Sequence, residues 1–261
     1  MTALATARSR SATRSGTIHG GPAMLVATRI GLAVGLQLLL SGAVLVAGGD
    51  AVRSPMNVVA GWWMVYASIV ELGTLGVLLW LVRREGITYR SLLGPPANAW
   101  QLALGAGAVL AASLPAVFFS ATLNSAVYGD VTPPILAIVD LPPMASAFSI
   151  LIWPLLISLA EPVAYLGVIL PRLERLTGSS AIAAGIVVAL WSAEHAFLPV
   201  LVTDGGVDLL FAATRVASVL PFMATWTALY YAFGRRVVPG MIGQGIFNGG
   251  TALGIAFGLV A

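Results

Sequence analysis

Seven long apolar segments set the limits on what this chain can fold into. Each exceeds the roughly 20 residues that an α-helix needs to cross the hydrocarbon core of a bilayer. Their apolar residues run continuously instead of alternating, which argues against the strands of a membrane barrel. The sequence therefore predicts an all-α polytopic membrane protein with seven transmembrane helices. The segments are residues 23–47, 56–82, 99–127, 144–170, 180–202, 207–233 and 237–260.

The charged residues are few, and their distribution predicts the orientation in the membrane. Only 9% of the chain is charged, whereas a soluble domain carries about 25%. Arginines lie in the N-terminal tail and in alternate loops, and the acidic residues of the remaining loops are mostly aspartates. Because arginine-rich loops stay in the cytoplasm, the N-terminus is expected there. The arginine-rich loops contain Arg83, Arg84, Arg90, Arg172, Arg175, Arg235 and Arg236, and the arginine-poor loops contain Asp130, Asp140, Asp204 and Asp208.

The domain organisation is simple. Residues 1–22 are rich in Ser, Thr, Ala and Gly and predict a disordered basic tail, and residues 23–261 predict a single transmembrane domain. Four prolines between residues 130 and 143 indicate an irregular outer loop. The chain has no cysteine, which excludes disulfides and thiolate nucleophiles. The net charge of +3 is explained by loop arginines that set topology. We expect membrane lipids, and no nucleic acid, among the partners.

Six ionisable residues fall inside the predicted spans, where a charge is costly and usually has a role. Arg29 lies near the inner end of its span, so its long side chain can reach the interface. Arg215 and Glu194 lie near the same face of the membrane and can form an ion pair. Glu71 is near mid-depth and can act as a structural hydrogen-bonding residue. The remaining two are Glu161 and His195.

Glu161, His195 and Asn248 form a candidate site because their expected depths agree. Glu161 precedes Arg172 by 11 residues, and Asn248 follows Val237 by 11 residues, which places both about 16 Å from the inner end. His195 is somewhat deeper, about 24 Å along its helix. Gln244 lies one helical turn before Asn248 and shares its face. Pro162 cannot donate a backbone hydrogen bond, so the helix is expected to bend beside Glu161.

These side chains suit water-activated hydrolysis of an amide. A carboxylate and an imidazole that meet across a water can take a proton from it, and two side-chain amides can donate hydrogen bonds to a developing oxyanion. The same residues can also hold helices together by hydrogen bonds, as polar residues in membranes often do. A single histidine within the predicted spans and no cysteine argue against a metal site, and no cofactor is expected.

Three short motifs resemble those of the CPBP family of membrane proteases, which includes the type II CAAX prenyl endopeptidases and the Abi proteins. The family motifs are E-E-x-x-x-R, F-x-x-x-H and H-x-x-x-N on successive helices. Here they read Glu161-Pro-Val-Ala-Tyr-Leu166, Trp191-Ser-Ala-Glu-His195 and Gln244-Gly-Ile-Phe-Asn248. The likeness extends over about residues 80–250, with a family-like core at about 144–250. The resemblance implies that Glu161, His195 and Asn248 are catalytic. We add Gln244 to the candidate catalytic site because its side-chain amide can complete the oxyanion hole with Asn248.

Three motif positions depart from the family pattern. The second glutamate is replaced by Pro162, the arginine by Leu166 and the last histidine by Gln244. Two functions are therefore kept open. The first is a CPBP-type intramembrane endopeptidase of the bacterial plasma membrane that cuts a membrane-embedded or lipidated peptide. The second is a pseudoprotease that binds peptides or partner proteins without cutting them. A transporter with a midplane site is a third alternative, although no inverted repeat is visible.

Overall fold

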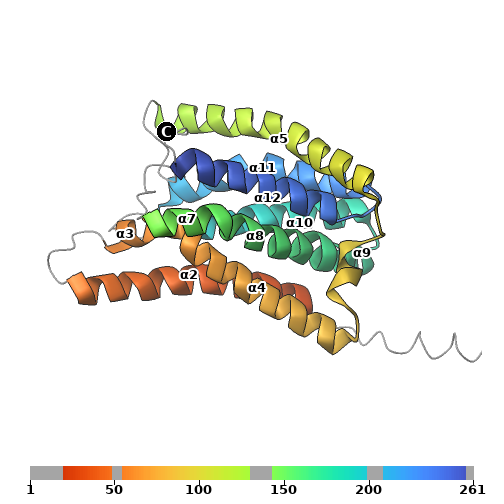
Figure 1. Ribbon diagram of the computed structural model, residues 1–261, viewed down its shortest axis with the longest axis horizontal. Helices are drawn as coiled ribbons and strands as arrows, with labels where there is room; N and C mark the ends of the chain where they lie inside the picture. Colours follow the sequence, from red (N-terminus) through yellow and green to blue (C-terminus); the bar gives the residue numbers. More distant parts are fainter. Residues whose placement is uncertain (1–19, 49–54, 130–142, 199–207, 257–261) are drawn as a thin grey trace, which may run out of the picture.

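The computed structural model describes residues 20–48, 55–129, 143–198 and 208–256, and every element in these ranges is a helix. The long helices run roughly side by side in one bundle (Figure 1). The all-α prediction is thus confirmed for the described residues. Most of the predicted tail (residues 1–19) and most of the outer loop (130–142) lie outside them. The elements are α2 (Gly20–Gly48), α3 (Pro55–Gly61), α4 (Trp63–Glu85), η3 (Tyr89–Leu93), α5 (Ala99–Tyr128), α7 (Pro143–Leu151), α8 (Trp153–Pro162), η4 (Val163–Ile169), α9 (Leu170–Thr177), α10 (Ser180–Glu194), η5 (His195–Phe197), α11 (Leu209–Ala232) and α12 (Val238–Ala256).

Six of the described helical stretches are long and apolar enough to cross a membrane, which makes this an integral multi-pass membrane protein. They are Gly20–Gly48, Trp63–Glu85, Ala99–Tyr128, Met144–Thr177, Ser180–Phe197 and Leu209–Ala232. The seventh predicted span forms α12, which is helical over Val238–Ala256 but is not among these six. Gln244, Asn248 and several glycines interrupt its apolar sequence. The first helix begins at Gly20, three residues before the predicted boundary.

The fourth predicted span is a composite of α7, α8, η4 and α9, and its irregularity centres on Pro162. This proline ends α8, and the chain continues as a π-helical segment, η4. The N–H of Val163 bonds to the carbonyl of Ala160 rather than to that of Leu159. The Leu159 carbonyl instead accepts a hydrogen bond from the Tyr89 hydroxyl of η3. The predicted disturbance beside Glu161 is therefore present, as a wide turn supported by a side chain from a neighbouring segment.

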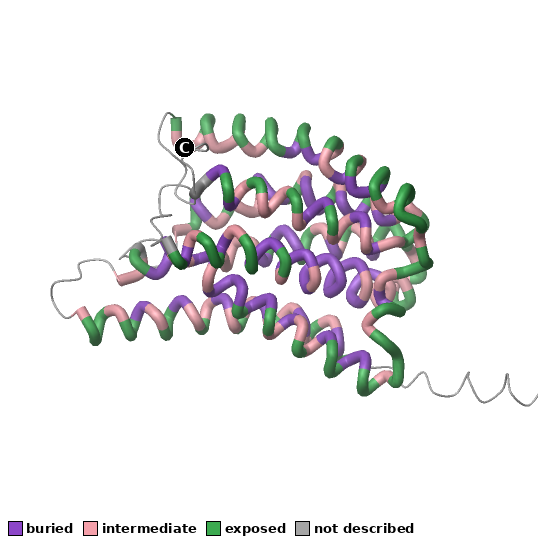
Figure 2. Tube along the Cα trace, viewed as in Figure 1, coloured by how far each residue is buried: buried purple, intermediate pink, exposed green. Residues whose placement is uncertain are grey.

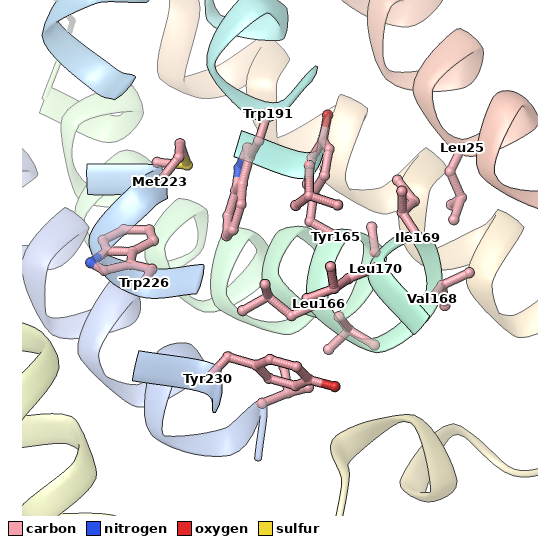
Figure 3. Close-up of a cluster of buried hydrophobic side chains, with 14 of the residues drawn as sticks. Leu25, Tyr165, Leu166, Val168, Ile169, Leu170, Trp191, Met223, Trp226 and Tyr230 are labelled. Carbon is pink, nitrogen blue, oxygen red and sulfur yellow. The ribbon is translucent and has the colours of Figure 1, made fainter. Parts of the chain in front are cut away.

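The centre of the bundle is formed by η4 and the helices around it. Residues of η4 and the start of α9 are almost fully buried, and Figure 3 shows several of them facing Trp191, Met223, Trp226 and Tyr230 of α10 and α11. Figure 2 shows buried residues concentrated along these inner segments, while α5 carries mostly exposed and intermediate positions. Its large apolar side chains Trp100 and Phe118 are 69% and 71% exposed. These faces suit contact with lipid tails.

Glycines let α12 approach two neighbouring helices closely. A Cβ added at Gly243 would lie 2.5 Å from Cγ1 of Val109 in α5. A Cβ at Gly245 would lie 3.3 Å from the side chain of Ser158 in α8. Small residues of this kind allow transmembrane helix backbones to come together. The close approach of α12 to α8 brings Gln244 beside Glu161.

Candidate functional site

A buried charge cluster joins four helices at the centre of the protein. It consists of Arg29 from α2, Glu71 from α4, Glu161 from α8 and Glu194 from α10, and each side chain is at most 2% exposed. Buried charges are tolerated only when they are paired and hydrogen-bonded. One guanidinium is shared here among three carboxylates, so the cluster is richer in acid than a simple ion pair.

The donors of Arg29 are fully used within this cluster. Its Nε lies 2.7 and 2.9 Å from the two carboxylate oxygens of Glu194. Its Nη1 lies 2.7 Å from Oε2 of Glu71 and 3.2 Å from Oγ1 of Thr74. Its Nη2 lies 2.9 Å from Oε1 of Glu71 and 3.1 Å from Oε1 of Glu161. The planar guanidinium thus forks between the acids, which lysine could not do.

Two further side chains complete the hydrogen bonding of the acids. Gln244 of α12 donates from Nε2 to Oε2 of Glu161, and Tyr165 of η4 donates from its hydroxyl to Oε2 of Glu194. The ring of Tyr165 stacks on Trp191, with centroids 4.8 Å apart and an interplanar angle of 7°, and Figure 3 shows the two rings side by side. Residues from five helical elements and η4 therefore converge on one polar centre.

This arrangement corrects two expectations about the arginines. Arg29 does not reach toward the membrane interface, because it is 1% exposed and bonded to three acids. Glu194 pairs with Arg29 rather than with Arg215. Within the described ranges, Arg215 makes neither an ion pair nor a hydrogen bond, and its Nε is buried without a partner. Glu71 does make hydrogen bonds, as expected, and their partner is Arg29.

The sequence contained a signal for the burial of Arg29. The buried residues of α2 recur at every fourth position and include Arg29 and the polar Gln37 and Ser41. A stripe with this spacing is the face that a helix turns toward its neighbours. An arginine on such a stripe must meet acids from other helices. The complete stripe is Gly21, Leu25, Arg29, Ala33, Gln37 and Ser41.

His195 begins η5, directly after α10, and is half-buried. Its Nδ1 lies 2.8 Å from the carbonyl oxygen of Trp191. Because a carbonyl can only accept, Nδ1 carries the proton, and Nε2 of the neutral ring is a free acceptor. Among the groups that act electrostatically on His195 are Glu161, Glu194 and Arg215. His195 therefore shares the neighbourhood of Glu161, without a direct hydrogen bond between the two in the described structure.

The other residues of the candidate site differ in their burial and in whether they contact Glu161. Gln244 is 1% exposed and contacts Glu161, while its Oε1 has no partner among the described residues. Asn248 is half-buried on the same helix, and no hydrogen bond of its side chain is found in the described structure. The departing positions Pro162 and Leu166 are both buried, and Leu166 lies in the apolar core.

In the described ranges, no group of three or more His, Asp or Glu side chains is arranged to hold a metal ion. The three acids of the charge cluster are instead directed at Arg29. Comparison of the chain with models of protein families, with curated proteins and with solved structures gave no match in any of the three.

Proposed function

We propose that this protein is a CPBP-like intramembrane endopeptidase that hydrolyses a membrane-embedded or lipidated peptide. The observation that carries the proposal is the hydrogen bond from Gln244 to Glu161. It joins the first and third motifs, which are 83 positions apart in the sequence. His195 of the second motif lies within electrostatic range of the same carboxylate. Residues of all three sequence motifs are therefore near the Glu161 carboxylate.

The proposed roles follow from the free hydrogen-bonding capacity of each side chain. Glu161 retains carboxylate lone pairs beyond those used by Arg29 and Gln244, so it can accept a proton from water. His195 offers Nε2 as an acceptor that can hold the second hydrogen of that water. The side-chain amide of Asn248 makes no hydrogen bond with the described residues. Gln244 uses one of its two N–H groups on Glu161. Both amides can donate to an oxyanion.

In the proposed reaction, Glu161 takes one proton from water as the water oxygen bonds to the carbonyl carbon of the peptide. The carbonyl electron pair moves to its oxygen, and the amides of Asn248 and Gln244 stabilise the resulting negative charge. The carbon–nitrogen bond then breaks, and the proton held by Glu161 passes to the leaving amine. The products are a carboxylic acid and an amine, and no redox partner is needed.

The substrate class follows from the depth of the site. Glu161 and His195 both lie in helical stretches of membrane-spanning length, so a soluble peptide would have to leave water to reach them. We further propose seven spans with a cytoplasmic N-terminus in a bacterial plasma membrane. The ion pairs Arg172–Glu85 and Arg235–Glu174 support this orientation, because they join residues from the three arginine-rich loops at one end of the bundle.

A non-catalytic, ligand-binding role is the second candidate, and one observation favours it. Both carboxylate oxygens of Glu161 already accept hydrogen bonds, one from Arg29 and the other from Gln244. A carboxylate with both oxygens occupied has fewer free lone pairs with which to receive a proton from water. In this alternative the charge cluster stabilises the bundle, and Asn248 and His195 bind a peptide or a partner protein.

The two candidates are separated by an experiment that does not require a known substrate. Membranes from cells expressing the wild type or Glu161→Gln would be compared by mass spectrometry for newly formed peptide termini. A peptide found this way would then be incubated with purified wild type, Glu161→Gln, His195→Ala and Asn248→Ala proteins. We expect cleavage by the wild type and a loss of at least roughly a hundredfold in the Glu161 and His195 variants.

Glu174→Gln is the matched control, since it removes a carboxylate at the end of the bundle, outside the candidate site. Thermal unfolding of each variant shows whether it is folded. Equal cleavage by all folded variants would rule out the catalytic proposal. Absence of any wild-type cleavage, together with peptide binding that depends on Asn248 and His195, would establish the second candidate.

A further inference from the structure

Arg29 makes one contact more than a structural ion pair needs. The charge of a buried guanidinium is neutralised when it meets one or two carboxylates of matching geometry. Glu71 by itself accepts one hydrogen bond from Nη1 and one from Nη2 of Arg29, and Glu194 accepts a hydrogen bond from Nε. These two acids would fix and neutralise Arg29 without Glu161. The shortest N–O distances are 2.7 Å to Glu71 and 2.6 Å to Glu194, against 3.1 Å to Glu161.

The position of Glu161 therefore depends on Arg29 more than the position of Arg29 depends on Glu161. Glu71 and Glu194 hold Arg29, and Arg29 extends one N–H to a third carboxylate. Glu161 in turn has one oxygen bonded by Arg29 from α2 and the other by Gln244 from α12. With both oxygens held from opposite neighbours, the carboxylate group cannot rotate freely about its last bond. Its remaining lone pairs keep fixed directions.

The backbone around Glu161 makes such support necessary. Glu161 precedes Pro162, where α8 ends and the regular helix gives way to the π-helical η4. Regular backbone hydrogen bonds are interrupted there, so the main chain alone fixes the side chain poorly. Polar contacts from other helices supply the missing constraint. A reacting group has to be held within a fraction of an ångström to be effective.

We propose that Arg29 is a positioning residue of the candidate site, which orients the Glu161 carboxylate through Nη2 while Glu71 and Glu194 hold the guanidinium in place. This inference rests on the proposed function for its catalytic meaning. It makes α2 part of the candidate site, although none of the three motifs lies on α2. Arg29 acts through Glu161 and does not touch the substrate.

The test uses a charge-balanced variant, because removal of Arg29 alone would leave three acids without a cation. Arg29→Gln/Glu71→Gln removes one positive and one negative group and leaves Glu194 and Glu161 in place. The matched control is Arg172→Gln/Glu85→Gln, which removes an ion pair at the end of the bundle. Arg29→Lys is the conservative variant, which keeps the charge but loses the fork. All proteins are full-length and purified in detergent.

Two readouts are measured on the folded variants. The first is cleavage of the peptide identified as above, where we expect kcat to fall by roughly a hundredfold in the Arg29/Glu71 variant with KM little changed. Arg29→Lys should recover part of kcat, and the control should match the wild type. The second is labelling of Glu161 by a hydrophobic carbodiimide, followed by peptide mass spectrometry. Labelling should accelerate several-fold when Arg29 no longer occupies Oε1.

The two readouts keep the inference separate from the proposed function. If the wild type cleaves nothing, the endopeptidase proposal fails, and faster labelling in the Arg29/Glu71 variant would still show that Arg29 holds Glu161. If Glu161 labelling and kcat both equal those of the Arg172/Glu85 control, the positioning role is overturned. A fall in kcat without any change in labelling would also overturn it, because Glu161 would not have been released. Should the double variant fail to fold, the same measurements on Arg29→Lys decide the question.

Discussion

Arg29 and Glu161 are 132 positions apart in the sequence, and Nη2 of Arg29 lies 3.1 Å from Oε1 of Glu161. The contact joins the first described helix to the middle of the fourth predicted span. It also makes the carboxylate of the first motif depend on a residue that precedes all three motifs. The buried charge cluster and the candidate site therefore share Glu161.

Removal of the Arg29 charge should destabilise the protein strongly. In Arg29→Gln, Glu71, Glu161 and Glu194 would remain buried without a cation, and breaking a buried ion pair in this way costs about 3–5 kcal/mol. We expect an unfolding free energy lower by about this amount, measured by denaturant titration in detergent micelles. The additional change Glu71→Gln should restore part of it. Unchanged stability in the single variant would show that Arg29 is not the counter-ion of the cluster.

Removal of the Arg215 charge, by contrast, should have little effect on the stability of the protein. Like Arg29, it falls inside one of the spans predicted from the sequence, but it makes no ion pair or hydrogen bond with the described residues. Replacement by glutamine removes a charge with only longer-range attraction to Glu161, so we expect stability to change by less than about 1 kcal/mol or to increase. The same denaturant titration provides the comparison with Arg29→Gln. A loss as large as that of Arg29→Gln would mean that Arg215 has a partner of equal strength.

The sequence was sufficient to predict helices and their order, because continuous apolar segments at bilayer length leave few alternatives. It also predicted the disturbance at Pro162, since a missing N–H is a local property. The partners of Arg29 could not be predicted in this way. Depth along a helix says how far a residue lies from the interface, but the rotation of each helix about its axis decides which residues meet.

The case of Glu194 shows the difference. Its depth matched that of Arg215, yet it faces α2 and bonds to Arg29. Tyr165 contributes to this choice, because its hydroxyl donates to Glu194 while its ring stacks on Trp191 one turn away from His195. Such contacts depend on how three helices pack together. The residue spacing within any one segment therefore does not predict them. The contact between Glu161 and Gln244, by contrast, agrees with the similar depths expected for Glu161 and for the face that Gln244 shares with Asn248.

Tyr89 provides a test of the link between η3 and the bend at Pro162. Its hydroxyl donates to the Leu159 carbonyl, and burial raises the pKa of Tyr89 to about 12. The unfolded value is about 10, so the neutral hydroxyl stabilises the fold fully below pH 10, and this contribution is lost as the pH rises toward 12. Tyr89→Phe should cost about 1–3 kcal/mol at neutral pH, because it leaves the Leu159 carbonyl without its donor.

The measurement for Tyr89 is unfolding free energy as a function of pH for the wild type and Tyr89→Phe. The difference between the two should be constant below pH 10 and should shrink between pH 10 and 12. A constant difference across the whole range would contradict the buried, hydrogen-bonded state of this hydroxyl.

The close contact between α12 and α5 can be tested with two glycines of α12. A Cβ at Gly243 would lie 2.5 Å from Cγ1 and 2.7 Å from Cβ of Val109, whereas one at Gly250 would meet nothing within 4 Å. Replacement of glycine by alanine within a helix favours the helix by about 1 kcal/mol, so Gly250→Ala should be neutral or stabilising. Gly243→Ala should instead lose about 1–3 kcal/mol through overpacking.

The consequence should reach the candidate site, because Gln244 follows Gly243 directly. Displacement of α12 by the added methyl group would draw Gln244 away from Glu161, so Glu161 should become more reactive toward a hydrophobic carbodiimide in Gly243→Ala and not in Gly250→Ala. The further change Val109→Ala removes Cγ1, the atom nearest the added methyl, and leaves Cβ at 2.7 Å. It should therefore reverse part, but not all, of both effects. If Gly243→Ala and Gly250→Ala are equally stable and equally labelled, then α12 does not depend on this contact to place Gln244.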